Sequence, residues 1–281
     1  MKLCRYGNVG LEKPGLIDGD QRLRDLSKVV DDIGPNEISP RGLKALAAVK
    51  PESLPLVNGI ARFGVPYVGI GKFVAIGLNY SDHAKEAGLP VPTEPVVFMK
   101  AITCISGPND NVIQPKHSTK LDWEVELGVV IGTEAQYVDE SEALTHVAGY
   151  CIVNDVSERA FQMATTQWDK GKGFDTAGPI GPWLVTADEI RDPQALDLSL
   201  DVNGKRMQSG NTRTMVFGVA KIVSHVSHYM RLQPGDIIAT GTPPGVGLGI
   251  KPTPVFLKPG DVMTLAIDGL GEQRQTVVPY A

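Results

Sequence analysis

The stretch that decides the fold is DWEVELGVVIG, residues 122–132. In an extended strand the side chains alternate between two faces, so Asp122, Glu124 and Glu126 would share one face and the apolar residues between them the other. The run continues as LGVVIG, the composition of a buried strand. These acids are therefore predicted to stand at the mouth of a buried strand, although three acids on one face can also line a solvated surface.

A further acid, Asp155, ends a second apolar strand in GYCIVNDVSER, residues 149–159. Carboxylates gathered at strand ends raise one another's pKa unless a positive charge compensates them. Oxygen ligands without cysteine or clustered histidine select Mg²⁺, Mn²⁺ or Ca²⁺ over zinc, and about three acids leave positions open for water and a chelating substrate. The sequence thus predicts a metal site of the catalytic kind.

The composition is that of an ordinary globular protein with a sizeable core: 281 residues, 42% hydrophobic and 21% charged. A net charge of -5, without a long basic run, gives no support to a role in binding nucleic acid or an anionic membrane. Without a signal-peptide pattern or a long apolar run, we expect a cytoplasmic protein. Cys4, Cys104 and Cys151 are too scattered for a disulfide framework or a zinc site.

Short strands dominate the patterning and no regular βαβ alternation occurs, which predicts a mainly β (α+β) fold. We expect a small N-terminal α+β domain with its linker over 1–68 and a catalytic domain over 69–281. The first domain would hold a hairpin and a helix that Ser39 caps. The second would hold strands within 72–80, 95–107, 121–132, 231–243 and 256–271, a hairpin turn at Asn203-Gly204, and an amphipathic helix within 215–232.

His83 and Glu86 lie three residues apart in GLNYSDHAKEAG, so they would meet on one face of a helix. A carboxylate that orients a histidine produces a general base near neutral pH, but the same spacing is also common in surface hydrogen bonds. His225 and His228 have this spacing as well, within a regular amphipathic pattern, and are interpreted as partly buried helix residues.

The glycines of TGTPPGVGLG, residues 240–249, invite comparison with a phosphate-binding loop. The segment has no Gly-Lys-Ser/Thr ending, and its adjacent prolines remove N–H groups that such a loop requires. We expect this loop to present Thr242 and a few backbone donors to a substrate carboxylate.

Taken together and in order, these segments resemble the fumarylacetoacetate hydrolase family, specifically its smaller bacterial branch similar to acylpyruvate hydrolases. The resemblance extends over about residues 70 to 280 and no single motif carries it. The matching segments are IGLNYSDHAKE (76–86), PVVFMK (95–100), DWEVELGVVIG (122–132), GYCIVNDVSERAFQ (149–162), KGFDTAGPIGPW (172–183), RTMVFG (213–218) and QPGDIIATGTPPGVG (233–247).

The resemblance implies a rolled β-sandwich catalytic domain with few helices, in a homodimer. It also implies that Mg²⁺ or Mn²⁺ is bound by Glu124, Glu126 and Asp155, with Asp122 as a neighbour. The implied catalytic residues are His83, Glu86 and Lys172; the implied substrate-side residues are Lys100, Gln162 and Thr242; Arg159 would have an orienting role. We expect a cation beside Lys172 to lower its pKa.

The implied reaction is hydrolysis of the C3–C4 bond of a 2,4-dioxo acid, giving pyruvate and a second acid. The substrate would be an acylpyruvate or a sugar-acid derivative such as 2,4-diketo-3-deoxy-L-fuconate or rhamnonate. The family's founding enzymes use an additional upstream acidic ligand with no obvious equivalent before residue 122, which favours the three-acid branch. Alternatives are a ureidoglycolate lyase, an oxaloacetate decarboxylase, a 2-hydroxyhepta-2,4-diene-1,7-dioate isomerase-type activity, and a non-enzymatic protein stabilised by a structural ion.

Overall fold

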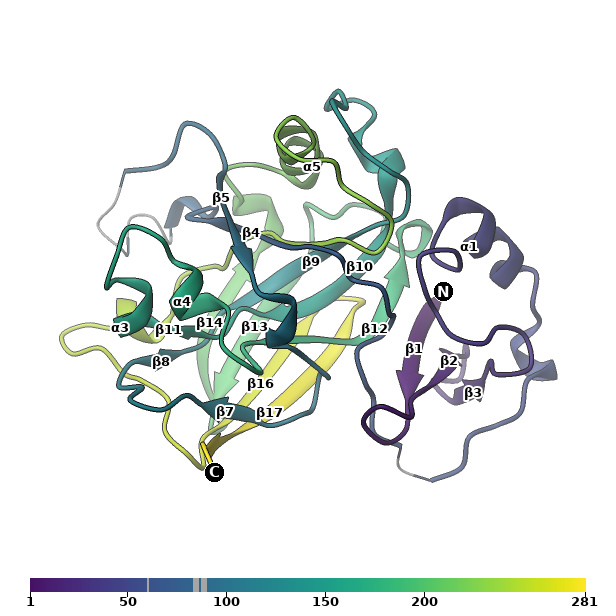
Figure 1. The fold of residues 1–281 in the computed structure, drawn as a ribbon, viewed down its shortest axis with the longest axis horizontal. Coiled ribbons are helices and arrows are strands. Elements are labelled where there is room, and N and C mark those ends of the chain that lie inside the picture. The colour runs from purple at the N-terminus through teal and green to yellow at the C-terminus, as the bar shows by residue number, and fades with distance from the viewer. Residues whose placement is uncertain (60, 83–85, 87–89) are drawn as a thin grey trace.

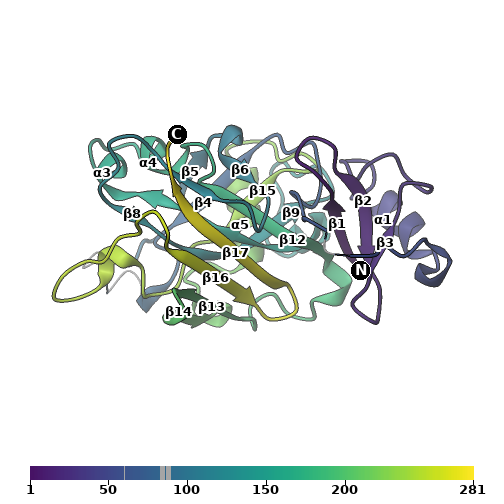
Figure 2. The same ribbon diagram turned by 90° about the horizontal axis from the view of Figure 1, so that it is seen from below.

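The computed structural model describes residues 1–59, 61–82, 86 and 90–281. Within these residues a ten-stranded sheet runs in the order β3-β2-β1-β12-β10-β9-β15-β4-β5, with β6 paired to β12. A five-stranded sheet runs β14-β13-β16-β17-β7, and β8 pairs with β11. Figures 1 and 2 show these sheets as layers with the short helices at the periphery. The predicted mainly β fold with few helices is confirmed.

The elements have these bounds. The large sheet contains β1 (Lys2–Tyr6), β2 (Lys13–Ile17), β3 (Leu23–Asp25), β4 (Phe73–Gly77), β5 (Val96–Lys100), β6 (Ile105–Ser106), β9 (Val125–Ile131), β10 (Val147–Asn154), β12 (Gly178–Thr186) and β15 (Ile237–Ala239). The other strands are β7 (Val112–Gln114), β8 (Leu121–Asp122), β11 (Ser157–Glu158), β13 (Asp197–Val202), β14 (Lys205–Asn211), β16 (Val262–Ile267) and β17 (Gly271–Pro279). The α-helices with described bounds are α1 (Pro40–Ala47), α3 (Arg159–Gln162), α4 (Asp169–Lys172) and α5 (Val219–Ser227).

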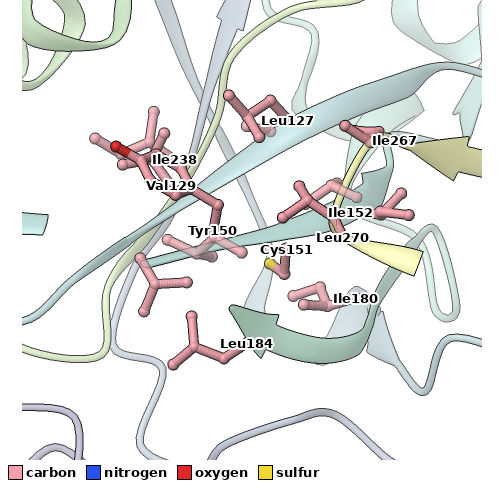
Figure 3. Close-up of a cluster of buried hydrophobic side chains, with 14 of the residues drawn as sticks. Leu127, Val129, Tyr150, Cys151, Ile152, Ile180, Leu184, Ile238, Ile267 and Leu270 are labelled. Carbon is pink, nitrogen blue, oxygen red and sulfur yellow. The ribbon is translucent and has the colours of Figure 1, made fainter. Parts of the chain in front are cut away.

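The main core lies between the two larger sheets. Strands β9, β10 and β12 of the large sheet contact β13, β16 and β17 of the smaller one. Figure 3 shows Leu127, Ile152 and Ile180 of the large sheet beside Ile267 and Leu270 of the opposing layer. Burial of these aliphatic side chains is the main stabilising contribution to the sandwich.

The N-terminal segment does not form a sheet of its own. Strand β1 pairs antiparallel with β12, so the predicted hairpin of β2 and β3 extends the edge of the large sheet (Figure 1). Helix α1 begins as predicted, because the Ser39 hydroxyl accepts the amide of Gly42 and Pro40 occupies the first turn. The division into two domains stays a prediction.

Two of the predicted strands are modified by the structure. The strand predicted over 121–132 is interrupted at Trp123 and Glu124, which separates β8 from β9. The segment 95–107 is divided by a 3-10 turn at Ile102–Cys104. The Asn203-Gly204 hairpin and the helix within 215–232 are present as predicted. Among the described residues no helix is long and apolar enough to cross a bilayer.

Candidate active site

Two neighbouring central strands bring the acidic residues together. In the antiparallel register of β9 and β10, Glu126 lies opposite Val153 and Val125 lies opposite Asn154. The pairing ends where the amide of Asp155 donates to the carbonyl of Glu124 at 2.9 Å. Asp155 thus follows β10 directly across from the residue that precedes β9, which explains why separate segments converge here.

The carboxylates of Glu124, Glu126 and Asp155 form a compact buried group, referred to below as the acidic triad. One oxygen from each lies within 4.8 Å of the others, and all three residues are buried. Oxygen donors at such spacing suit a hard divalent cation such as Mg²⁺ or Mn²⁺. The expected grouping of these three acids is present in the structure, and their role as metal ligands stays a prediction.

Two buried lysines lie against this triad. Lys172 Nζ donates to Glu124 Oε2 at 2.8 Å and to Asp155 Oδ2 at 2.7 Å. Lys100 Nζ donates to Asp155 Oδ1 at 2.5 Å and to the backbone carbonyl of Lys172. Asp155 is therefore fixed by an ammonium group on each oxygen, one from β5 and one from α4.

Arg159, at the start of α3, links the triad to Asp122. Its guanidinium donates to Asp122 Oδ2 at 2.8 Å, to Glu124 Oε1 at 2.6 Å and to Gln162 Oε1 at 3.0 Å. Asp122 therefore neighbours the triad without joining it, because its side chain holds the arginine that orients Glu124. This arrangement agrees with the orienting role expected for Arg159.

The glycine-rich loop of residues 240–249 donates backbone N–H groups to the protein's own acids. Gly241 N donates to Glu126 Oε2 at 2.8 Å, and Gly245 N donates to both oxygens of Glu86 at 3.1 and 3.2 Å. The amides of residues 247 and 248 donate to Asp122 at 2.6 and 3.0 Å. The expectation that these donors serve a substrate carboxylate is wrong for these four amides, since protein carboxylates already use them.

The balance of charge shows that the site fits a divalent cation. With every group ionised, the four buried carboxylates of Asp122 and the acidic triad exceed the three buried cations Lys100, Lys172 and Arg159 by one, a net charge of about -1. Among the described ion pairs none neutralises Glu126. A divalent ion on the triad would change the net charge to about +1, which favours an anionic ligand.

The electrostatic surroundings also shift individual pKa values. Burial, and then the nearby Asp155 and Glu124 carboxylates, raise the pKa of Glu126 well above its usual range. For Lys172, burial lowers the pKa, but Asp155 and Glu124 raise it by more, so its pKa is raised. The lowered pKa expected for Lys172 refers to the metal-bound protein; in the absence of the cation the carboxylates reverse that direction.

The triad opens into a cavity of about 540 Å³. Glu86, Lys172, Gln162 and Thr242, which the family resemblance implied for the site, line it together with the acids, and their roles stay predictions. Thr242 donates to the carbonyl of Val125 at 2.9 Å and accepts from Gln208. The size is that of a site for a small organic acid.

Lys100 is a predicted site residue that does not appear in the described lining of the cavity. His83 lies outside the described residues, so its catalytic role stays a prediction. Lys100 is buried, and its described hydrogen bonds are to Asp155 and to the backbone carbonyls of Val156 and Lys172. A direct contact of Lys100 with substrate therefore stays a prediction, while its contact with Asp155 is a property of the structure.

Sequence reasoning missed the apolar side of the cavity. Phe98 and Trp168 line it, as do Val246 and Leu248 of the loop. The pattern of PVVFMK predicts only a strand, and Trp168 stands before the short helix α4 without any periodic signal. The convergence of these side chains depends on tertiary packing between β5, α4 and the loop, which a linear pattern does not reveal.

Known proteins match this chain over most of its length. Residues 72–278 match the model of the fumarylacetoacetate (FAA) hydrolase C-terminal family. A Burkholderia ambifaria protein, provisionally named a hydrolase without a stated substrate, is 62% identical over 277 residues, which are 98% of each chain.

Several solved structures share the fold over the whole chain. Fumarylacetoacetate hydrolase from Exiguobacterium antarcticum is 35% identical with a TM-score of 0.89, and both chains are covered completely. Maleylpyruvate hydrolase from Sphingobium sp. SYK-6, solved with manganese(II) and pyruvate, is 29% identical with a TM-score of 0.83 and the same coverage. A 2-hydroxyhepta-2,4-diene-1,7-dioate isomerase from Mycobacterium marinum is 30% identical with a TM-score of 0.75, covering 100% of this chain and 99% of that one.

These neighbours are enzymes of one family that includes hydrolases and isomerases. With the family match over residues 72–278 and an acidic triad at the end of a cavity, the chain belongs to the fumarylacetoacetate hydrolase family.

Proposed function

We propose that the protein is a divalent-metal-dependent hydrolase that cleaves the C3–C4 bond of a 2,4-dioxo acid to pyruvate and a second acid. The observation that carries this proposal is the buried acidic triad, flanked by Lys172 and Arg159 and open to the cavity. Maleylpyruvate hydrolase, with manganese and pyruvate bound, supports the same chemistry here. The metal would be Mg²⁺ or Mn²⁺, and we propose a homodimer, as the sequence resemblance implies.

The acidic triad would supply the ligands for the metal, and the surrounding lysine and arginine side chains hold the carboxylates of the triad in position. A bound divalent cation would polarise a chelating 2-oxo acid and stabilise the enolate of the product. Arg159 orients Glu124 and Lys100 orients Asp155, so both carboxylates are held before any ligand arrives. Such preorganisation lowers the reorganisation that binding and reaction require.

The remaining groups account for the movement of protons. We assign His83 the role of general base, with Glu86 as its orienting carboxylate, in line with the sequence resemblance. His83 takes a proton from water while the oxygen attacks C4; the C3–C4 bond then breaks and its electron pair moves to C3. We assign to Lys172, which lines the cavity, the return of a proton to C3, giving pyruvate.

The Glu86 carboxylate has a defined place in this site. Gly245 of the glycine-rich loop donates to both of its oxygens, and the same loop binds Glu126 through Gly241. The proposed orienting carboxylate and one member of the acidic triad are thus held by one short segment. One loop thus positions both the carboxylate that we assign to water activation and a carboxylate that we assign to the metal.

An isomerase activity is the second candidate, because a 2-hydroxyhepta-2,4-diene-1,7-dioate isomerase shares the fold. An isomerase needs proton transfer on a stabilised enolate but no attack by water. The pairing of Glu86 with His83 in the sequence favours water chemistry. Ureidoglycolate cleavage, oxaloacetate decarboxylation and a purely structural ion remain alternatives for the same triad.

The proposal is tested by incubating the protein with Mg²⁺ and a panel of acylpyruvates and 2,4-diketo-3-deoxy sugar acids, with ureidoglycolate in parallel. Pyruvate is followed through a coupled dehydrogenase, and glyoxylate separately. We expect pyruvate formation that EDTA and Glu124→Ala abolish, and that His83→Ala abolishes without loss of metal binding. Glyoxylate without pyruvate would establish the lyase instead, and metal binding without turnover of any compound would establish a structural ion.

A further inference from the structure

Beyond its charged end, the cavity is bounded by apolar side chains. We call the following set the apolar wall: Ile76, Phe98, Met163, Trp168, Val246 and Leu248. They come from β4, β5, the segment between α3 and α4, and the glycine-rich loop. Segments far apart in sequence therefore supply the same kind of surface to one side of the cavity.

The apolar wall is continuous with the catalytic end. The ammonium of Lys172 lies 5.3 Å from the centre of the Phe98 ring, and the same ammonium contacts two members of the acidic triad. The rings of Phe98 and Trp168 meet edge to face, with centres 5.3 Å apart and planes at 69°. A ligand anchored at the triad would place its next atoms against Phe98 and its far end against Trp168.

Gly77 makes room for the indole of Trp168. A Cβ atom at this position of β4 would lie 2.5 Å from Cζ3 of Trp168, but at an ordinary 3.6 Å from Val96. The indole therefore packs directly on the backbone of the strand. An added methyl group at this position would act mainly on the tryptophan.

The polar residues of the cavity outside the charged cluster are few in the described lining, and most are already engaged. Thr242 donates to Val125, Gln162 accepts from Arg159, and Glu86 accepts from Gly245. Lys251 also lines the cavity and is exposed. Hydroxyl groups of a sugar acid would lose water against the apolar wall without gaining equivalent partners, which is unfavourable.

From this geometry we infer that the substituent on C4 of the substrate is an apolar alkyl or aryl group, and that Trp168 determines this specificity. The inference rests on the proposed function and selects acylpyruvates over 2,4-diketo-3-deoxy sugar acids. An aryl group would contact the rings of both Phe98 and Trp168, whereas a methyl group would reach only the nearer ring, that of Phe98.

The test compares kcat/KM for benzoylpyruvate, acetylpyruvate and 2,4-diketo-3-deoxy-L-fuconate with Mg²⁺ present. We expect kcat/KM for benzoylpyruvate to exceed that for the sugar acid by about a hundredfold, because a hydrophobic pocket discriminates between substrates by factors of about this size. Trp168→Ala should lower kcat/KM for benzoylpyruvate at least about tenfold and that for acetylpyruvate less than about threefold.

Three further variants separate specificity from general damage. Gly77→Ala should reproduce the selective loss by displacing the indole, and Trp168→Phe should restore most of the activity on benzoylpyruvate. Tyr229→Ala removes an exposed aromatic side chain outside the cavity lining and should leave kcat/KM for both acylpyruvates unchanged. Calorimetric titration of the variants with benzoylpyruvate and Mg²⁺, in a His83→Ala background that prevents turnover, should show the same order of affinities.

The outcomes distinguish this inference from the proposed function. If the sugar acid is the better substrate, or if Trp168→Ala weakens both acylpyruvates equally, the inference is wrong and the hydrolase proposal stands. A preference for succinylpyruvate that Lys251→Met abolishes would also overturn it, in favour of a dicarboxylic substrate. If no compound yields pyruvate, the proposed function fails, and weak binding of benzoylpyruvate that is insensitive to Trp168→Ala then overturns the inference as well.

Discussion

Glu126→Gln tests the acidic triad at the member that lacks a cationic partner among the described ion pairs. Its Oε2 accepts only the Gly241 amide among the described hydrogen bonds, and a glutamine oxygen can accept the same bond. The substitution removes the ionisable carboxyl group whose pKa burial and the nearby Asp155 and Glu124 carboxylates raise well above its usual range. We therefore expect the metal-free variant to be at least as stable as the wild type, with much weaker metal affinity.

The magnitude follows from linkage between binding and folding. At a metal concentration of about 100 times Kd, the wild type gains about 2.7 kcal/mol. Loss of residues that merely support a metal ligand weakens affinity by about 10- to 100-fold, so loss of a ligand should cost about 100-fold or more. The variant then gains only about 0.4 kcal/mol at the same concentration.

The assay is thermal unfolding with EDTA or with Mn²⁺. An unfolding entropy of about 2.1 cal/mol/K per residue gives about 0.6 kcal/mol/K for the whole chain. Metal should therefore raise Tm by about 5 °C in the wild type and by less than about 1 °C in the variant. Asp236→Asn is the matched control, since Asp236 is fully buried but paired with Lys72 in a distant turn; its Tm should fall while the metal shift persists. A full metal shift in Glu126→Gln would refute the assignment of the triad.

Three further predictions concern other parts of the structure. Lys172→Met should lower pyruvate formation at least about a hundredfold, while metal affinity, measured by titration with Mn²⁺, is retained or increased because an ammonium no longer competes for Glu124 and Asp155. Gly241→Ala should reduce the free energy of unfolding by about 1–3 kcal/mol in chemical denaturation, because φ is +96° and the new Cβ would lie 2.8 Å from Cβ of Asn79; an unchanged midpoint would contradict this. Burial is the largest single effect on Asp18 and raises its pKa, but hydrogen bonds from the Arg22 and Asp20 amides and the Arg24 and Arg22 guanidinium groups together lower the pKa to about 2. The ionised carboxylate therefore stabilises the fold above the usual pKa near 4, and this contribution is lost as the pH falls towards 2. Asp18→Asn should show a flatter loss of Tm over that pH range.

Local patterns predicted the elements whose determinants are close in sequence. Ser39 with Pro40 predicted the start of α1, and Asn203-Gly204 predicted the β13–β14 hairpin, because caps and tight turns depend on a few adjacent residues. The alternation of acidic and apolar residues around Glu124 and Glu126 also predicted that both acids lie in the site. Their common group with Asp155 followed from two strand ends and is present in the structure.

Long-range partners set the features that the sequence did not reveal. Asp122 looked equivalent to Glu124 by alternation, but the break after β8 turns it towards Arg159 and the glycine-rich loop. The amides of that loop looked free for a substrate, whereas Glu126, Glu86 and Asp122 use them. In both cases the outcome depends on which distant group satisfies a buried charge, and spacing along the chain does not encode that choice.

The most direct test of the central claim is a proton NMR spectrum of one incubation of benzoylpyruvate with the protein and Mg²⁺. The account predicts equal amounts of pyruvate and benzoate, at a rate that falls to background with EDTA and returns with Mn²⁺. Pyruvate formation unaffected by EDTA, or conversion of the substrate to a tautomer without benzoate, would contradict metal-dependent hydrolysis of the C3–C4 bond.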